Sequence, residues 1–174
     1  MIELRDWQLS YEVMNSLYHK VDQSHCLVQL AVPLERANTF RYLQAVQAGI
    51  SNGKPFIAKG IWLDGTLIGK IELSRYDSMD AELDIVIAKE YCSKGYGRQA
   101  VALLEQMVRE NGWCRSIYAY VDTANIPAGK MLAACGFEIG RFFSADVMVP
   151  YEGTYAIKTA RGCEMRKIFE ENSR

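Results

Sequence analysis

Residues 89–99 read KEYCSKGYGRQ, and they lie between an apolar stretch and a run of residues at helical spacing. Gly95 and Gly97 stand where a strand is expected to end and a helix to begin. Unpaired backbone N–H groups and the helix dipole make such a helix start a good anion site. Glycine lets a phosphate approach the backbone, and Lys94 and Arg98 could add charged hydrogen bonds. The stretch predicts either a phosphate-binding loop or a structural turn.

Two common phosphate-binding patterns fit this loop poorly. A nucleoside-triphosphate loop requires G-x-x-x-x-G-K-[ST], whereas Lys94 precedes both glycines here. A dinucleotide fingerprint opens an early βαβ unit, whereas this loop follows about half of the chain, although Ala100 is a permitted substitute for the third glycine. The loop alone leaves the turn and the phosphate site open.

The segments around the loop give the fold class. Asp64-Gly65 is a two-residue hairpin signal between apolar runs, Asn125 is a natural helix N-cap, and Gly136 is a good helix stop. The expected elements are a strand over 2–7, helices over 11–21 and 34–50, two strands joined at Asp64-Gly65, a strand over 81–88, a helix ending at Asn111-Gly112, a strand over 116–121, a helix over 128–134, and strands over 137–143 and 163–169. The order β-α-α-β-β-β-loop-α-β-α-β-β predicts an α/β (α+β) fold with a single mixed, mostly antiparallel central sheet flanked by helices. Without a repeat or a linker, residues 1–174 are expected to form a single domain.

Composition limits the class of function. The chain has 174 residues, 49% hydrophobic residues and a net charge of −1, so neither nucleic acid nor an anionic membrane is an expected partner. The five cysteines contain no C-x-x-C pair, which predicts neither a metal site nor a disulfide framework. Free thiols, and an N-terminus without an apolar signal region, favour a cytoplasmic protein.

Two motifs together resemble the Gcn5-related N-acetyltransferase (GNAT) superfamily. The stretches KGYGRQAVALLEQMV (94–108) and VDTANIPAGKMLAACGFEIGR (121–141) are similar to [QR]-x-x-G-x-[GA] and N-x-x-A-x-x-[LM]-[YL]-x-x-x-G-F at the family's spacing. The first motif falls on Cys92, Gly95 and Gly97, and the second on Asn125, Ala128, Met131, Leu132, Gly136 and Phe137. The resemblance implies the GNAT fold and acetyl-CoA (CoA) as co-substrate.

The resemblance also implies where acetyl-CoA would bind. In this family the strand before the loop and the strand after the helix splay apart, and the pantetheine amides pair with the exposed backbone as an added strand would. The cofactor-binding residues implied are Ile85, Val86 and Ile87 on the first strand, Lys94, Gly95, Tyr96, Gly97 and Arg98 at the pyrophosphate, and Asn125 and Lys130 beyond the second strand. Asn125 could equally be a pure N-cap, and Lys130 a solvated helix lysine.

Two carboxylates are candidates for the catalytic base. Glu82 and Asp84 are two residues apart on an expected strand and therefore point to the same face. A carboxylate there could take the proton from an amine, whose ammonium form has a pKa of roughly 10.4. Family members often place a functional glutamate at this position, which ranks Glu82 ahead of Asp84. The alternative is a solvated polar strand face.

The leading hypothesis is an N-acetyltransferase that transfers acetyl directly to a primary amine, and the acidic face favours a cationic acceptor. Two departures from the family pattern keep a non-catalytic acyl-CoA-binding sensor or regulatory module as an alternative. Cys92 replaces the usual Gln or Arg, and Leu132 replaces the tyrosine that protonates the thiolate in many members. The segment 148–162 is expected to be an acceptor-side flap or an extended hairpin. A monomer and a homodimer both fit.

Overall fold

The structure is a computed structural model, and it describes residues 1–6, 10–21, 44–51, 54–75, 79–151 and 154–169. Its strands are β1 (Ile2–Arg5), β2 (Ile50–Ser51), β3 (Lys54–Leu63), β4 (Thr66–Arg75), β5 (Asp80–Ile87), β6 (Ser116–Asp122), β7 (Glu138–Tyr151) and β8 (Thr154–Ile168). Its helices are α1 (Tyr11–Lys20), the 3-10 turn η1 (Lys89–Tyr91), α3 (Tyr96–Asn111) and α4 (Ile126–Ala134). Residues 44–48 are also helical. The predicted element order is confirmed for these residues except for the short strand β2, which was not predicted.

The strands form one sheet in the order β1-β3-β4-β5-β6-β8-β7, and β2 adds to β3. Every recorded pairing is antiparallel except that of β5 with β6, which is parallel. The predicted mixed, mostly antiparallel sheet is therefore confirmed. The one parallel pair lies in the middle of the strand order, and it becomes the centre of the candidate site.

The turn between β3 and β4 follows the prediction from Asp64-Gly65. Both residues have positive φ, 47° for Asp64 and 83° for Gly65. Two consecutive residues of positive φ are the signature of the tight hairpin turn that this dipeptide favours. The turn sets the register in which Leu63 pairs with Thr66.

The predicted end of the second helix was wrong. The helix expected over 34–50 cannot reach Ile50, because Ile50 and Ser51 pair with Pro55 and Lys54 as β2 and β3. Gly49 adopts a φ of 65°, a conformation that commonly ends helices. Residues 34–43 of the predicted helix lie outside the described residues.

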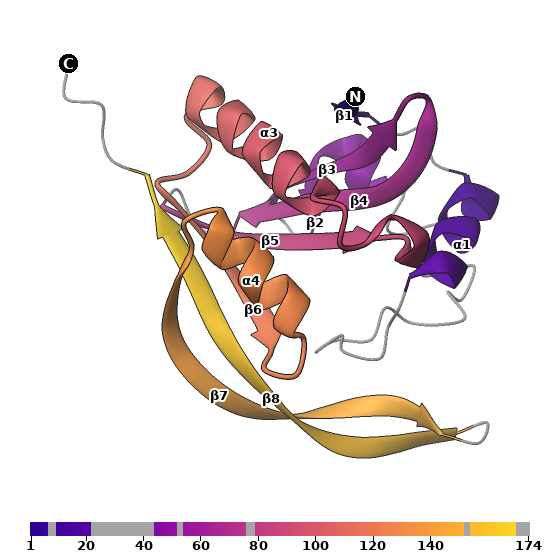
Figure 1. Cartoon of the computed structure of the whole chain (residues 1–174), viewed down its shortest axis with the longest axis vertical. Helices are drawn as coiled ribbons and strands as arrows, with labels where there is room; N and C mark the ends of the chain where they lie inside the picture. Colours follow the sequence, from indigo (N-terminus) through magenta and orange to yellow (C-terminus); the bar gives the residue numbers. More distant parts are fainter. Residues whose placement is uncertain (7–9, 22–43, 52–53, 76–78, 152–153, 170–174) are drawn as a thin grey trace.

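The main core lies between the sheet and the helices α3 and α4, which cover the same face (Figure 1). Ala100, Val101, Leu104 and Val108 of α3 are fully buried and lie on one face of the helix. They meet apolar residues of β3, β4 and β6, namely Ile61, Ile68, Ile71, Leu73 and Ile117. No helix in the described part of the chain has the length and apolar character needed to cross a membrane.

The last two strands are longer than predicted. The expected strands over 137–143 and 163–169 are parts of β7 and β8, which pair continuously out to Tyr151 and Thr154. Most of the segment 148–162 is therefore the outer part of a long β-hairpin, which curves away from the helices (Figure 1). This agrees with the extended-hairpin alternative for that segment.

Candidate acetyl-transfer site

The site is built around a fork between β5 and β6. The two strands pair in parallel from Asp80↔Ser116 to Glu82↔Tyr118, and no pairing is recorded beyond that point among the described residues. The strands then diverge, as Figure 1 shows. The far half of β5, Ile85–Ile87, runs along one side of the opening. A backbone edge of this kind can accept an extended ligand by strand addition.

The glycine loop lies at the open end of the fork. Ser93 and Gly95 have φ values of 61° and 80°, and Gly95 is the N-cap of α3. Tyr96, Gly97 and Arg98 form the first helical turn, whose N–H groups have no partners within the helix. The Lys94 and Arg98 side chains are exposed. The stretch thus forms a left-handed turn that leads into a helix start, a geometry common to a structural turn and an anion-binding loop.

The local packing explains the small residues of the loop. A Cβ added at Gly95 would meet nothing within 4 Å, so this glycine is needed for its φ rather than for space. A Cβ added at Gly97 would lie 3.4 Å from Cδ1 of Ile87 and 3.6 Å from Cγ of Met131. Gly97 therefore sits where β5, α3 and α4 meet. The cationic side chains Lys94 and Arg98 are exposed on either side of the helix start.

Cys92 turns away from the loop mouth. Its Sγ lies 3.6 Å from the carbonyl oxygens of both Ile87 and Ala88, to which the thiol can donate. The side chain therefore closes the end of β5. Tyr96 packs against the core, and its ring centroid lies 6.5 Å from that of Tyr91, so the contribution of Tyr96 to an anion site is its backbone amide.

Helix α4 borders the β6 side of the fork. Asn125 caps it, because its Oδ1 accepts a hydrogen bond of 3.2 Å from the Ala128 amide. Lys130 is exposed on the helix. Leu132 is 2% exposed and belongs to the core, so α4 offers no proton donor at this position.

The two candidate bases lie on the face opposite α3 and α4. Ala81 and Leu83 are buried in the core, whereas Glu82 is half-buried and Asp84 exposed, which confirms the predicted alternation. Glu82 stands at the last paired position of the fork, opposite Tyr118. We call this position the fork apex. Asp84 lies beyond the paired part of the fork, and its partner in the sheet is Glu72 of β4.

A buried lysine organises the carboxylates on the β4 side. Lys70 is 2% exposed, and its Nζ lies 2.6 Å from Oε1 of Glu72 and 3.5 Å from Oδ2 of Asp84. Glu72 is itself buried. Asp84 is thus tied to a cation, and its carboxylate is directed toward β4 rather than toward the fork. Lys70 and Glu72 are not among the site residues predicted from the sequence, although two charged residues at alternating positions of an apolar strand are a usable signal.

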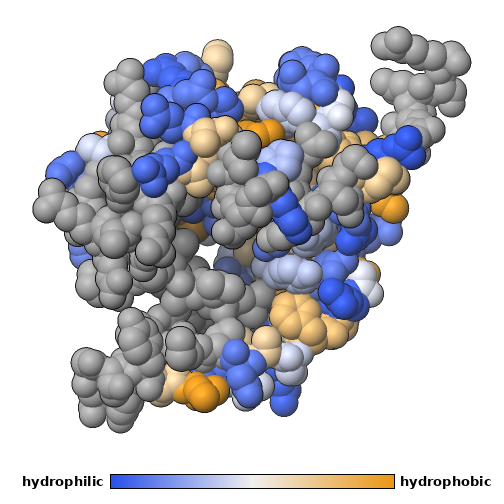
Figure 2. All heavy atoms as spheres, turned by 180° about the vertical axis from the view of Figure 1, so that it is seen from behind, coloured by the Kyte–Doolittle hydropathy of each residue, from blue (hydrophilic) through white to orange (hydrophobic). Residues whose placement is uncertain are grey.

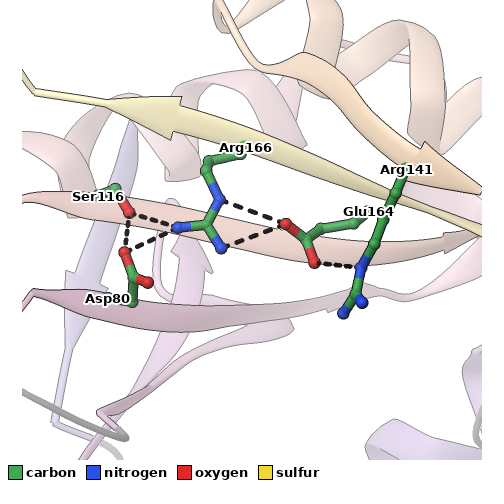
Figure 3. Close-up of polar contacts among 5 residues, drawn as sticks. All are labelled: Asp80, Ser116, Arg141, Glu164 and Arg166. Carbon is green, nitrogen blue, oxygen red and sulfur yellow. Dashed lines mark hydrogen bonds and ion pairs between the residues drawn. The ribbon is translucent and has the colours of Figure 1, made fainter.

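A second polar network closes the paired end of the fork (Figure 3). Arg166 of β8 donates from Nη1 to Oδ1 of Asp80 at 2.7 Å and to Oγ of Ser116 at 3.0 Å. It also donates to Oε1 of Glu164 from Nε and Nη2, at 3.3 and 3.2 Å. Arg141 of β7 binds the other oxygen of Glu164 at 3.1 Å. We call these five residues the fork clamp, because they join the paired ends of β5 and β6 to β8 and β7.

The clamp shifts the pKa values of its members. The hydrogen bond from Ser116 and the guanidinium of Arg166 lower the pKa of Asp80 below its usual 3.8, against the opposing effect of partial burial. For Arg166 burial opposes the charge, but hydrogen bonds to Asp80 and Glu164 outweigh it and raise the pKa. Both groups are therefore charged at neutral pH. The sequence analysis treated this stretch of β8 only as a strand and missed Arg166.

The comparisons with known proteins agree with this geometry. The model of the acetyltransferase (GNAT) family matches residues 15–137. The ribosomal-protein-alanine N-acetyltransferase from Brucella melitensis is 16% identical, with a TM-score of 0.71 over 97% of this chain and 99% of that one. The ribosomal L7/L12 alpha-N-protein acetyltransferase RimL, solved with coenzyme A, is 14% identical, with a TM-score of 0.75 over 97% and 94%.

The microcin C7 self-immunity acetyltransferase MccE, solved with acetyl-CoA and AMP, is 15% identical, with a TM-score of 0.73 over 97% of this chain and 92% of that one. None of the curated proteins searched matches the sequence. At such low identities the solved structures establish the fold, while the family model establishes the family.

Proposed function

The chain belongs to the GNAT acetyltransferase family, and from this premise we propose that it transfers the acetyl group of acetyl-CoA to a primary amine by direct transfer in a ternary complex. The observation that carries the proposal is the position of Glu82. It lies at the apex of an open strand fork, on the face that α3 and α4 leave uncovered, while an anion-binding helix start lies at the other end of the fork.

The binding half of the proposal rests on the backbone. The edge of Ile85–Ile87 would hold the pantetheine arm, and the amides of residues 94–98, with Lys94 and Arg98, would hold the pyrophosphate. Asn125 contributes as the cap that fixes α4 beside the fork. Lys130 is exposed, and long lysine side chains keep their ammonium group in water. It would therefore act on the cofactor phosphates only through its charge.

The chemical half requires proton removal from the acceptor. Bound acetyl-CoA supplies an activated thioester, and the amine that reacts with it must be unprotonated. Overall, an amide N–C bond replaces the thioester C–S bond, and the ammonium loses two protons, of which one ends on the thiol and one in solvent. Glu82 accepts the proton at the fork apex, directly or through water. Asp84, bound to Lys70, is better placed to attract a cationic acceptor than to take its proton.

The alternative is an acyl-CoA-binding sensor or regulatory module without catalysis, and the buried Leu132 favours it because it removes the usual acid. Acyl transfer remains feasible without that acid, since a thiol pKa of roughly 8.5 makes the thiolate a tolerable leaving group.

The experiment measures free-thiol release from acetyl-CoA with a panel of primary amines. Glu82→Gln should lower kcat/KM by about 10²- to 10⁴-fold, as expected for loss of a general base, and should flatten the pH profile. Asp84→Asn should lower it by less than about tenfold, and Glu110→Gln, on the exposed end of α3, serves as the neutral control. Wild-type turnover by Glu82→Gln at every pH would exclude Glu82 as the base. Calorimetric binding of acetyl-CoA without turnover of any amine would favour the sensor.

A further inference from the structure

An aromatic strip leads away from the fork apex on the same face as Glu82. Tyr118 and Tyr120 of β6 and Phe143 of β7 form this strip. The ring centroids of Tyr118 and Tyr120 are 5.5 Å apart and those of Tyr120 and Phe143 are 5.3 Å apart, both in edge-to-face geometry. Tyr118 pairs directly with Glu82 across the fork. The strip therefore starts at the proposed base and runs toward the β7–β8 hairpin.

The strip is shaped by a glycine. Phe143 pairs with Gly162 of β8, and a Cβ at Gly162 would lie 2.4 Å from the Phe143 ring. Only glycine allows the ring to lie flat across the neighbouring strand, where it meets Tyr120. Such an arrangement keeps aromatic surface on the sheet face instead of leaving the ring upright.

The strip remains accessible. Ile117, Ala119 and Val121 alternate with the tyrosines and are buried in the core, so Tyr118 and Tyr120 point to the other face. Tyr120 is 40% exposed, which is high for a large ring packed between two others. Figure 2 views the molecule from behind, the side opposite the view of Figure 1.

The charges on this face divide into two regions. Beside the apex, on β4 and β5, the three carboxylates of Glu72, Glu82 and Asp84 accompany one lysine, Lys70. Negative charge is therefore in excess where the amine would react. Beside the strip, the carboxylates of Asp80 and Glu164 are bound by Arg166 and Arg141, so that the charges there are matched.

This division separates two kinds of acceptor. A polyamine would place a second ammonium over the strip, where the adjoining carboxylates already bind arginines. Arg166 also already lies over the Tyr118 ring, with its Cζ 5.1 Å from the ring centroid, and occupies the cation–π position there. An uncharged flat group suits the strip better, because aromatic rings pair edge-to-face or offset and bury apolar area.

We propose that the acceptor is a primary amine joined by a short linker to an aromatic or similarly flat group, with the amine at Glu82 and the ring on Tyr120 and Phe143. This inference rests on the proposed function, since it identifies the acceptor of the same site. A free arylalkylamine and a peptide that begins with an aromatic residue present the same chemistry.

The test compares 2-phenylethylamine with propylamine and spermidine as acceptors. The KM for 2-phenylethylamine should be about tenfold lower than for the other two. Tyr120→Leu and Phe143→Leu should each remove this difference by raising the KM for 2-phenylethylamine about tenfold. Phe142→Leu is the matched control, because Phe142 is 70% exposed and pairs with the buried Cys163, on the opposite face of β7. A tripeptide beginning with phenylalanine is compared as a further acceptor. A lower KM for this tripeptide than for 2-phenylethylamine indicates a peptide acceptor, and a higher KM indicates a free arylalkylamine.

Gly162→Ala provides a second variant that displaces the Phe143 ring without removing it, in case Phe143→Leu fails to fold. It should raise the KM for 2-phenylethylamine while sparing that for propylamine. A KM for spermidine equal to or below that for 2-phenylethylamine, or a loss of the difference in Phe142→Leu alone, would overturn the inference.

Calorimetry separates failure of this inference from failure of the proposed function. If no amine causes thiol release from acetyl-CoA, the proposed function is wrong. Titration of 2-phenylethylamine into the CoA-saturated protein then still decides the inference: binding about tenfold tighter than to Tyr120→Leu supports the strip, and equal binding overturns it.

Discussion

Replacement of Arg166 by methionine should destabilise the protein and loosen the fork at the same time. Methionine retains much of the length and apolar volume of the arginine stem, so the change removes mainly the guanidinium. The variant loses the hydrogen bonds to Asp80, Ser116 and Glu164 that join β5 and β6 to β8 (Figure 3).

The magnitude follows from the burial of the partners. Exposed ion pairs contribute less than about 1 kcal/mol, whereas breaking a buried pair costs about 3–5 kcal/mol. Arg166 has a side chain 31% exposed, its partner Asp80 is 36% exposed, and its partner Glu164 is 10% exposed. Because Glu164 keeps its second cation, Arg141, we expect a loss of about 2 kcal/mol in the free energy of unfolding.

Urea unfolding measures this loss, with Arg141→Met as the matched control. Arg141 binds the same carboxylate but is 67% exposed, so its replacement should cause no resolvable change. Arg166→Met should also raise the KM for acetyl-CoA, because the clamp holds the strands whose divergence forms the binding edge. Equal stability of the two variants, with an unchanged KM, would refute the role assigned to the clamp.

Three further changes test other contacts. Gly69→Ala would place a Cβ 2.3 Å from the Val86 carbonyl oxygen, so β5 must move; we expect a loss of about 1–3 kcal/mol by urea unfolding and weaker acetyl-CoA binding by calorimetry, and unchanged values would contradict the close approach. The lowered pKa of Asp80 stabilises the folded state fully above pH 3.8 and ceases to do so as the pH falls through the lowered value, so stability curves of Asp80→Asn should be flatter than wild type below pH 3.8; parallel curves would show that Asp80 is not the titrating group. Lys167→Met removes bonds of 2.6 Å from Nζ to Glu105 and to the Cys135 carbonyl, and should cost about 3 kcal/mol, part of which a double variant with Glu105→Gln should recover; an additive double variant would argue against the pair.

Much of the fold could be predicted from local sequence signals. The Asp64-Gly65 turn, the Asn125 cap and the apolar stripe of α3 each act over a few residues, and each is found where the pattern placed it. The lengths of β7 and β8 could not be predicted in the same way, because residues 144–151 gain their strand geometry by pairing with residues 154–161 rather than by alternating burial against a core. A pattern based on burial therefore predicts an end of β7 that is too early and a start of β8 that is too late.

In the candidate site too, the features set by nearby residues could be predicted, and those set by strand pairing could not. The glycine loop and the Glu82–Asp84 pair are contiguous in sequence and were recognised by spacing. The fork clamp and the aromatic strip join residues that are far apart, such as Asp80 with Arg166 and Tyr120 with Phe143. Only strand register brings these residues together, and the register of β6 on β8 is not encoded in either segment alone.

The contacts of Cys92 and Leu132 show what these two departures from the family motif do in the structure. The thiol of the exposed Cys92 reaches the carbonyl oxygens of Ile87 and Ala88 at the end of β5, and Leu132 is buried in the core. Affinity for the pyrophosphate then rests on backbone amides and on Lys94 and Arg98, whose exposed charges are screened by salt. The absence of an acid at Leu132 places the greater demand on proton removal and positioning at the fork apex. Under the proposed function, catalysis therefore depends on side chains of the sheet face opposite α3 and α4, where Glu82 and Tyr118 pair across the fork.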